Sequence, residues 1–145
     1  MKRIVFDPEY CTGCCACQMA CLDQRDIETA AGQKPLRFMT SRVSDGRVIW
    51  KSTGCVHCGV CLRACPVGAI RRDPDSGYIL LDEAACRGCG RCAAACPLGV
   101  ISLRPSTGTA TKCDGCAARV AAGLLPACVH TCPTGALKLS EGKEP

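Results

Sequence analysis

Aromatic side chains are scarce in this sequence, whose 145 residues include two Phe, two Tyr and one Trp. Aromatic residues usually supply much of the area buried in a core, so something other than large side chains must fill this interior. No apolar run approaches the roughly 18 residues that a membrane-spanning helix needs, and none before Cys11 is long enough for a signal peptide. We therefore expect a cytoplasmic protein without a membrane span of its own, although a partner that has a signal can export a subunit that lacks one.

Cysteine, in contrast, is abundant, with 17 residues in the chain. Such a density indicates either a disulfide scaffold or a metal protein, and in a reducing compartment it indicates metal binding. The odd number and the clustering of the cysteines disfavour disulfides. Zinc sites use pairs of C-x2-C separated by a longer loop, so the third cysteine of a C-x2-C-x2-C tract would be superfluous for zinc.

Four cysteine motifs recur along the chain. The second and third are near copies that start 31 residues apart, the first has Leu22 where the others have Pro, and the fourth carries an insertion before its third cysteine. The motifs are Cys11-x2-Cys14-x2-Cys17-x3-Cys21, Cys55-x2-Cys58-x2-Cys61-x3-Cys65-Pro, Cys86-x2-Cys89-x2-Cys92-x3-Cys96-Pro and Cys113-x2-Cys116-x11-Cys128-x3-Cys132-Pro.

This spacing suits the shape of a [4Fe–4S] cubane. Two-residue gaps let a tight loop bring three thiolates to three corners of one cube, while the fourth cysteine faces away and, in two-cluster ferredoxins, binds the other cluster. The Pro that follows fixes φ and directs the chain out of the loop. We expect the glycines two residues further on, Gly68, Gly99 and Gly135, to adopt backbone angles that other residues resist.

Sixteen cysteines thus predict four [4Fe–4S] clusters, and the order of the motifs favours a nested pairing. Motifs two and three are adjacent and alike, and motifs one and four lie near termini whose strands can pair. The predicted ligand sets are Cys11, Cys14, Cys17 and Cys132; Cys113, Cys116, Cys128 and Cys21; Cys55, Cys58, Cys61 and Cys96; and Cys86, Cys89, Cys92 and Cys65. Sequential pairing, one with two and three with four, is the alternative.

The predicted fold is α+β, with two ferredoxin-like dicluster modules related by pseudo-symmetry. Residues 51–103 form the inner module, and residues 1–50 with 104–145 form the outer one. Short segments between the motifs predict antiparallel hairpins and short helices, and Gly, Ser, Thr and Pro predict linkers. The predicted strands are 3–6, 79–81, 101–103 and 136–139, the helices 18–25, 62–64, 91–95 and 114–125, and the linkers 23–53 and 105–111.

The formal net charge of +5 does not predict a nucleic-acid partner. An oxidised [4Fe–4S] cluster with four thiolates carries about −2, so four clusters bring the loaded chain to about −3. The basic residues are also scattered, and few aromatic residues accompany them.

Single residues near the motifs carry weaker predictions. Cys15 breaks the register of motif one and is interpreted as a spare thiol, with a ligand or reactive thiol as the alternative. His57, between two predicted ligands, is interpreted as a surface residue or one just outside the ligands, and the sharper hypothesis is that its ring N–H bonds to a cluster sulfur. Trp50 is interpreted as a packing residue rather than an electron relay.

The segment from Thr111 to Leu137, with its K-C-D-G-C and A-C-V-H-T-C-P-T-G-A tracts, resembles the fourth motif of iron–sulfur subunits in the dimethyl-sulfoxide-reductase family. Similar subunits serve formate dehydrogenases, hydrogenase complexes and tungsten aldehyde oxidoreductases. In some relatives the residue matching Cys89 is replaced and a three-iron or otherwise altered cluster results, but Cys89 is present here, so four cubanes are expected. The long insertions and C-terminal extension of the larger members are missing, which favours a compact complex.

The resemblance implies a subunit that relays electrons to or from a molybdenum- or tungsten-pterin catalytic subunit of the formate dehydrogenase or aldehyde oxidoreductase type. A flavin subunit or a ferredoxin is a candidate second partner, in anaerobic metabolism. No nucleophile–base set or open metal site is visible, so we expect an electron-transfer subunit without a catalytic site of its own. The alternative function is a free-standing polyferredoxin shuttle.

Overall fold

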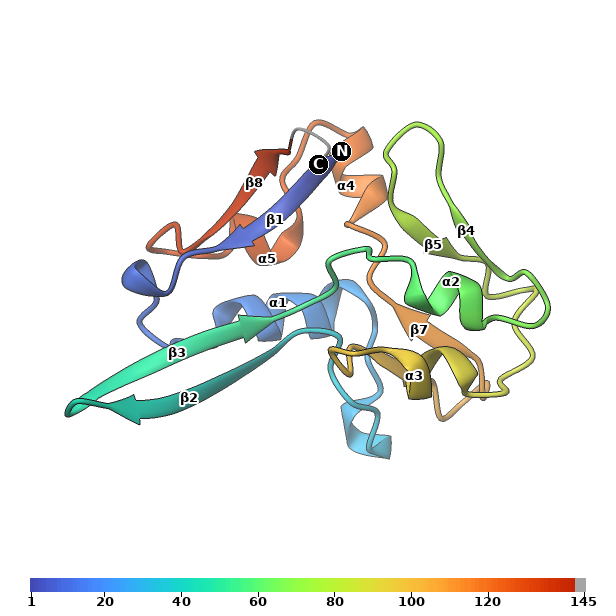
Figure 1. The fold of residues 1–145 in the computed structure, drawn as a ribbon, viewed down its shortest axis with the longest axis horizontal. Coiled ribbons are helices and arrows are strands. Elements are labelled where there is room, and N and C mark those ends of the chain that lie inside the picture. The colour runs from blue at the N-terminus through green and yellow to red at the C-terminus, as the bar shows by residue number, and fades with distance from the viewer. Residues whose placement is uncertain (143–145) are drawn as a thin grey trace.

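The computed structural model describes residues 1–142 as a small α+β protein made of short elements (Figure 1). Within these residues the strands form four separate antiparallel pairs: β1 (Lys2–Phe6) with β8 (Leu137–Glu141), β2 (Phe38–Ser44) with β3 (Arg47–Thr53), β4 (Ile70–Arg72) with β5 (Ile79–Leu81), and β6 (Ile101–Leu103) with β7 (Ala110–Lys112). The helices are α1 (Ala16–Gln24), α2 (Val60–Ala64), α3 (Arg91–Ala95), α4 (Ala117–Ala121) and α5 (Ala127–His130), with single 3-10 turns at Pro8–Tyr10 and Thr29–Ala31. The predicted fold class is confirmed.

The first and last strands, β1 and β8, pair with each other, which brings residues 2–6 beside residues 137–141 (Figure 1). Ile4 lies opposite Leu139, and Leu137, 2 % exposed, turns into the core. β1, β5, β6 and β8 correspond to the four strands predicted from the sequence. Pairing of β1 with β8 places motif one, just after β1, beside the end of motif four, just before β8.

The helices of the cysteine motifs pack in two pairs, α1 with α5 and α2 with α3. α1, α2 and α3 correspond to the helices predicted at residues 18–25, 62–64 and 91–95. α2 and α3 stop at Cys65 and Cys96, whose backbone is extended because a residue before Pro disfavours the helical conformation. Among the residues described, no helix is long and apolar enough to cross a membrane.

Cysteine side chains occupy much of the interior, which explains how a core forms although the chain has few aromatic residues. One apolar cluster joins Cys61 and Cys92 to Ile70, Ile79 and Ile101. A second cluster joins Cys17, Cys128, Val129 and Leu137. Each cluster therefore lies where a pair of motif helices meets.

The linker predicted over residues 23–53 is wrong in its second half, where β2 and β3 form a long hairpin that projects from the body (Figure 1). Asp45 and Gly46 at its tip have φ of 50° and 73°, as a type I′ turn requires. Val43 and Val48 face each other across the strands beside this turn. The Asp-Gly pair, with a valine two residues away on each side, is a signal for a hairpin. The prediction missed it because the segment is rich in residues typical of loops.

The single helix predicted over residues 114–125 is also wrong. α4 starts only after Cys116, which has a left-handed φ of 54°, and it ends at Ala121, two residues before Gly123, which has φ of 78°. The Leu124 N–H bonds to the Arg119 carbonyl and the Gly123 N–H to the Val120 carbonyl, which is a Schellman ending. The predicted linker over 105–111 likewise ends early, because β7 begins at residue 110.

Candidate metal centres

One cavity collects the first three cysteines of motif one together with the last cysteine of motif four. Cys11, Cys14, Cys17 and Cys132 all line it, and Phe6, Met39 and Leu137 close its apolar side. α1 carries Cys17 inward, and the turn after α5 supplies Cys132. These four residues are the first ligand set predicted from the spacing.

A second cavity collects the complementary cysteines of the same two motifs. Cys21, Cys113, Cys116 and Cys128 line it, so the last cysteine of motif one meets the first three of motif four. Cys55 of motif two also reaches this cavity. The structure thus gathers the cysteines of motifs one and four around two cavities and brings motif two alongside the second cavity, while the assignment of these cysteines to individual clusters stays a prediction.

The cysteines of motifs two and three meet where α2 packs on α3. Cys61 and Cys92 are buried there, and Cys65, Cys86 and Cys96 pack against the same apolar cluster. Burial raises the pKa of Cys61, and the charges of Cys58 and Cys96 act in the same direction. The last cysteine of motif three therefore lies close to motif two.

Buried sulfur atoms crowd the second cavity. Burial, together with the charges of Cys113 and Cys128, raises the pKa of Cys21 to about 12. Burial also raises the pKa of Cys128 to about 11, against the opposing charge of Arg37. The Cys21 and Cys128 thiols are therefore protonated in the absence of metal, and a cluster that binds them as thiolates must displace their protons.

The arrangement fits a cluster better than a single ion. Nowhere in residues 1–142 do three His, Cys, Asp or Glu side chains converge closely enough to hold one metal ion. A zinc site needs its ligand sulfurs about 2.3 Å from a common centre, whereas the thiolates of a cubane bind different iron atoms. Each cavity is lined by the four cysteines of one predicted set and by one more, Cys15 in the first cavity and Cys55 in the second. Cysteines spread around the walls in this way match the second geometry, so the residues present fit [4Fe–4S] clusters.

Backbone N–H groups point at the sulfur that opens three of the motifs. His57 donates its N–H to Cys55 Sγ at 3.4 Å, and Gly115 donates to Cys113 Sγ at 3.3 Å. Ala110, from β7, donates to Cys86 Sγ at 3.3 Å. Such bonds stabilise negative charge on sulfur and help to set the reduction potential of a bound cluster.

Backbone N–H groups in the turn after the fourth cysteine also stabilise negative charge on sulfur. For Cys65, burial alone would raise the pKa, but the N–H groups of Val67 and Ala69 outweigh it and lower the pKa. Gly68 lies within this turn with φ of 67°, which leaves the N–H groups on one side of the chain. Gly99 and Gly135 have φ of 64° and 72°, so the expected unusual backbone angle is confirmed at all three glycines.

The residue before the second cysteine adopts a left-handed conformation in every motif: Gly13, His57, Gly88 and Gly115 have φ of 74°, 54°, 70° and 68°. A second left-handed residue precedes α1, α2 and α3, and there Cys15 stands where the other two motifs have Gly59 and Gly90. Cys15 therefore occupies a backbone-turning position, with its Sγ 3.4 Å from the Gly13 carbonyl.

Two of these glycines also lie directly beneath aromatic rings. A Cβ atom on Gly13 would lie 2.1 Å from the Trp50 ring, and one on Gly115 would lie 2.2 Å from the Tyr78 ring. Trp50, on β3, thus packs on the loop of motif one, in agreement with its interpretation as a packing residue.

Gly13→Ala is expected to lower the apparent free energy of unfolding of the loaded protein by about 3 kcal/mol, because it combines left-handed strain with overpacking against Trp50. Gly32→Ala is the matched control, since Gly32 has φ of 82° but nothing lies within 4 Å of the added Cβ. The control is expected to cost about 1 kcal/mol. Guanidinium titrations followed by circular dichroism and cluster absorbance measure both, and equal losses would contradict the prediction.

His57 is buried, 8 % exposed, which corrects the surface alternative and leaves the position just outside the predicted ligands. Its ring stacks on Tyr78 with centroids 4.4 Å apart, and Nδ1 accepts the Ile79 N–H at 3.1 Å. Burial lowers the pKa of His57 to about 3, so the ring is neutral. The described contact of His57 with a predicted cluster ligand, Cys55, is made by its backbone N–H rather than by its ring.

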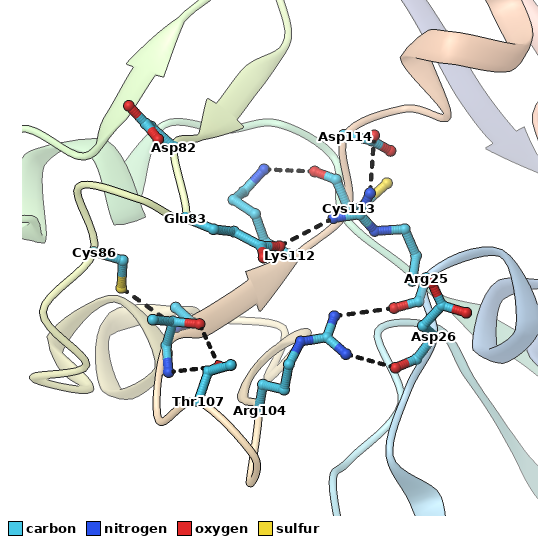
Figure 2. A network of polar contacts seen from close by, with 12 residues as sticks. Arg25, Asp26, Asp82, Glu83, Cys86, Arg104, Thr107, Lys112, Cys113 and Asp114 are labelled. Carbon is cyan, nitrogen blue, oxygen red and sulfur yellow. Dashed lines mark hydrogen bonds and ion pairs between the residues drawn. The ribbon is translucent and has the colours of Figure 1, made fainter.

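Sequence reasoning missed two buried cations, because it treated the basic residues as a scattered, solvated set. Arg37 is 5 % exposed and its guanidinium bonds to Ser52 Oγ at 2.8 Å. Lys112 is 2 % exposed, and its Nζ donates to the carbonyl oxygens of Ile79 and Cys113. Figure 2 shows Lys112 beside Cys113, at the end of β7. The only sequence signal for Lys112 was its place next to a motif.

Residues 46–142 match the family described as 4Fe-4S dicluster domain. Over 144 residues the chain is 36% identical to the B subunit of the anaerobic dimethyl sulfoxide reductase of Haemophilus influenzae, with 91% of this chain and 70% of that protein covered. It is 38% identical over 141 residues to the thiosulfate reductase electron transfer subunit PhsB of Salmonella typhi, with 93% and 73% covered. It is 33% identical over 160 residues to the iron-sulfur subunit of the nitrate-inducible formate dehydrogenase of Escherichia coli, with 97% and 54% covered.

Proposed function

The chain belongs to the 4Fe-4S dicluster family of iron–sulfur electron-transfer subunits, and on that premise we propose that it relays electrons between a molybdenum- or tungsten-pterin catalytic subunit and a second redox partner. The relatives are electron-transfer subunits of oxidoreductase complexes rather than catalytic subunits. A bound cluster supplies one-electron exchange at each site. The chain's own part is to hold the clusters at fixed positions and to set their potentials.

The observation that carries the proposal is the continuity of the cysteine sets. Cys17 and Cys128, from the two outer sets, pack in one apolar cluster. Cys55, from an inner set, lines the same cavity as Cys113. Cys61 and Cys92 then join the two inner sets. Each proposed set therefore lies beside the next one, as a relay requires.

We propose that the ligand sets are the four derived from the spacing, with motif one paired with four and motif two with three. The division into an outer module (1–50 and 104–145) and an inner module (51–103) belongs to the same proposal. The packing of α1 on α5 and of α2 on α3 supports it. Three cysteines are exposed, Cys14 in the first set, Cys89 in the last and Cys58 in a middle one, so both ends of the relay are open to contact with partners.

Anaerobic purification of the native complex tests this function. We expect a large pterin-containing subunit in equal amount and about sixteen iron atoms per copy of this chain. A lone chain with the same iron content would contradict the partner and support a free polyferredoxin shuttle. A chain that contains zinc instead of iron would overturn the proposal altogether.

The finer assignment is to an enzyme of the formate dehydrogenase or aldehyde oxidoreductase type. The purified complex should then oxidise formate or an aldehyde while the clusters of this chain become reduced. If the complex instead reduces dimethyl sulfoxide or thiosulfate and oxidises neither formate nor an aldehyde, the chain would belong with the dimethyl sulfoxide reductase or thiosulfate reductase subunits. The cytoplasmic location stays a prediction, which cell fractionation tests.

A further inference from the structure

Lys112 and Arg37 are the two cationic side chains that are less than one-tenth exposed among residues 1–142. A buried charge is costly unless a group of opposite charge or strong hydrogen bonds compensate for it. Within the described part of the chain, neither side chain forms an ion pair with a carboxylate. The hydrogen bonds of the Lys112 ammonium go to carbonyl oxygens, so among the residues described its full charge has no anionic partner.

Lys112 lies between two of the proposed ligand sets. On one side its Nζ donates to the carbonyl of Cys113, at 2.7 Å, the first cysteine of motif four. On the other side it donates to the carbonyl of Ile79, whose own N–H bonds to His57 in motif two. Cys55, also in motif two, lines the same cavity as Cys113.

We propose that Lys112 is the fixed counter-charge of the two clusters that meet across the module boundary, and that it raises their reduction potentials so that electrons collect at this pair within the relay. The inference rests on the proposed function and on its ligand sets for Cys113, Cys116, Cys128 and Cys21 and for Cys55, Cys58, Cys61 and Cys96.

The direction of the effect follows from charge. One electron that enters a cluster makes it more negative by one unit, while no bond forms or breaks. An ammonium group in a poorly solvated interior stabilises that added charge far more than a solvated one does. Net charge near a cluster is one of the quantities that set its potential.

The other charged side chains nearby also favour higher potentials for the clusters beside Lys112 than for the end clusters. Arg37 lines the cavity of Cys113 and adds a second buried cation on that side. Arg25 lines the same cavity, but its charge is offset by Asp114 at 3.0 Å and by Glu83 at 3.8 Å. Lys112 does not line the cavity of the first set, and Arg37 approaches that set only through Ser52, whose Oγ lies 3.6 Å from Cys17 Sγ. The pair beside Lys112 should therefore accept electrons before the two end clusters.

Lys112→Gln tests the charge, because glutamine keeps an amide donor for the carbonyl oxygens but is neutral. An anaerobic redox titration followed by EPR measures each variant. In Lys112→Gln the ratio of reduced to oxidised cluster at a fixed potential should fall at least tenfold for two clusters, about 59 mV for a one-electron couple. The other two clusters should change by less than about twofold. Lys112→Arg should restore the ratios, and Lys34→Gln, at an exposed lysine, should leave all four unchanged.

Two results separate this inference from the proposed function. If the unsubstituted chain holds four clusters but Lys112→Gln shifts none of them, the inference is wrong and the relay stands. If the unsubstituted chain does not hold four clusters, the proposed function itself fails.

If Lys112→Gln cannot hold its clusters, the redox titration of the unsubstituted protein provides the test. The first electron should then produce an EPR signal that comes from one of the two clusters beside Lys112. Such a signal is identified because Cys116→Ser or Cys58→Ser changes it. A first electron in a signal altered by Cys14→Ser or Cys89→Ser would overturn the inference.

Discussion

Removal of iron and sulfide is expected to unfold most of this chain. The two apolar clusters of the core are built around cysteines, and β4 to β7 are only three residues long each. Isolated two-stranded hairpins are marginally stable in water. Metal binding supplies about 10 kcal/mol or more in small metal-dependent domains, which is comparable to the whole stability of a domain.

Far-UV circular dichroism before and after anaerobic chelation measures this effect. Most of the helical and strand signal should disappear with the clusters, and proteolysis should become rapid throughout the chain. Reconstitution with iron and sulfide should restore both properties. A sample carried through the same steps without chelator is the control, and an unchanged spectrum after complete loss of iron would contradict the prediction.

Cys21→Ala is expected to remove or convert the cluster of motif four rather than that of motif two. Cys21 lines one cavity with Cys113, Cys116 and Cys128, although it lies about ninety residues before the first of them in the sequence. Loss of the cluster would lower the iron content by about four atoms per chain, and conversion to a three-iron form by about one. Cys15→Gly is the matched control, because glycine occupies the equivalent left-handed position before α2 and α3. The control should keep the full iron content.

Double variants decide between nested and sequential pairing. With nested pairing, Cys21→Ala combined with Cys116→Ala affects one cluster, so the double variant should lose little more iron than the more severe single variant. Cys21→Ala combined with Cys58→Ala affects two clusters, and the losses should add. Sequential pairing predicts the opposite pattern, since Cys21 would then share a cluster with motif two.

The hairpin β2–β3 and the pair α4–α5 show where prediction from the sequence failed. In both places a local signal was present: Asp45-Gly46 marks a type I′ turn, and Gly123 ends a helix. Composition outweighed these signals, because the segment around β2 and β3 is rich in small polar residues. The same reasoning succeeded for α2 and α3, where a left-handed glycine and a proline fix both ends of the helix.

The sequence by itself determined the features that depend on a few neighbouring residues: the spacing of the thiols, the short helices between them and the turns at Gly68, Gly99 and Gly135. These features follow from local backbone sterics, so they can be predicted from a short segment without the rest of the chain. Only the tertiary structure decided that Lys112 and Arg37 are buried, that Trp50 covers Gly13 and that Tyr78 stacks on His57. Burial depends on contacts between residues far apart in the chain, and the sequence of a short segment does not show which distant residues will pack on it.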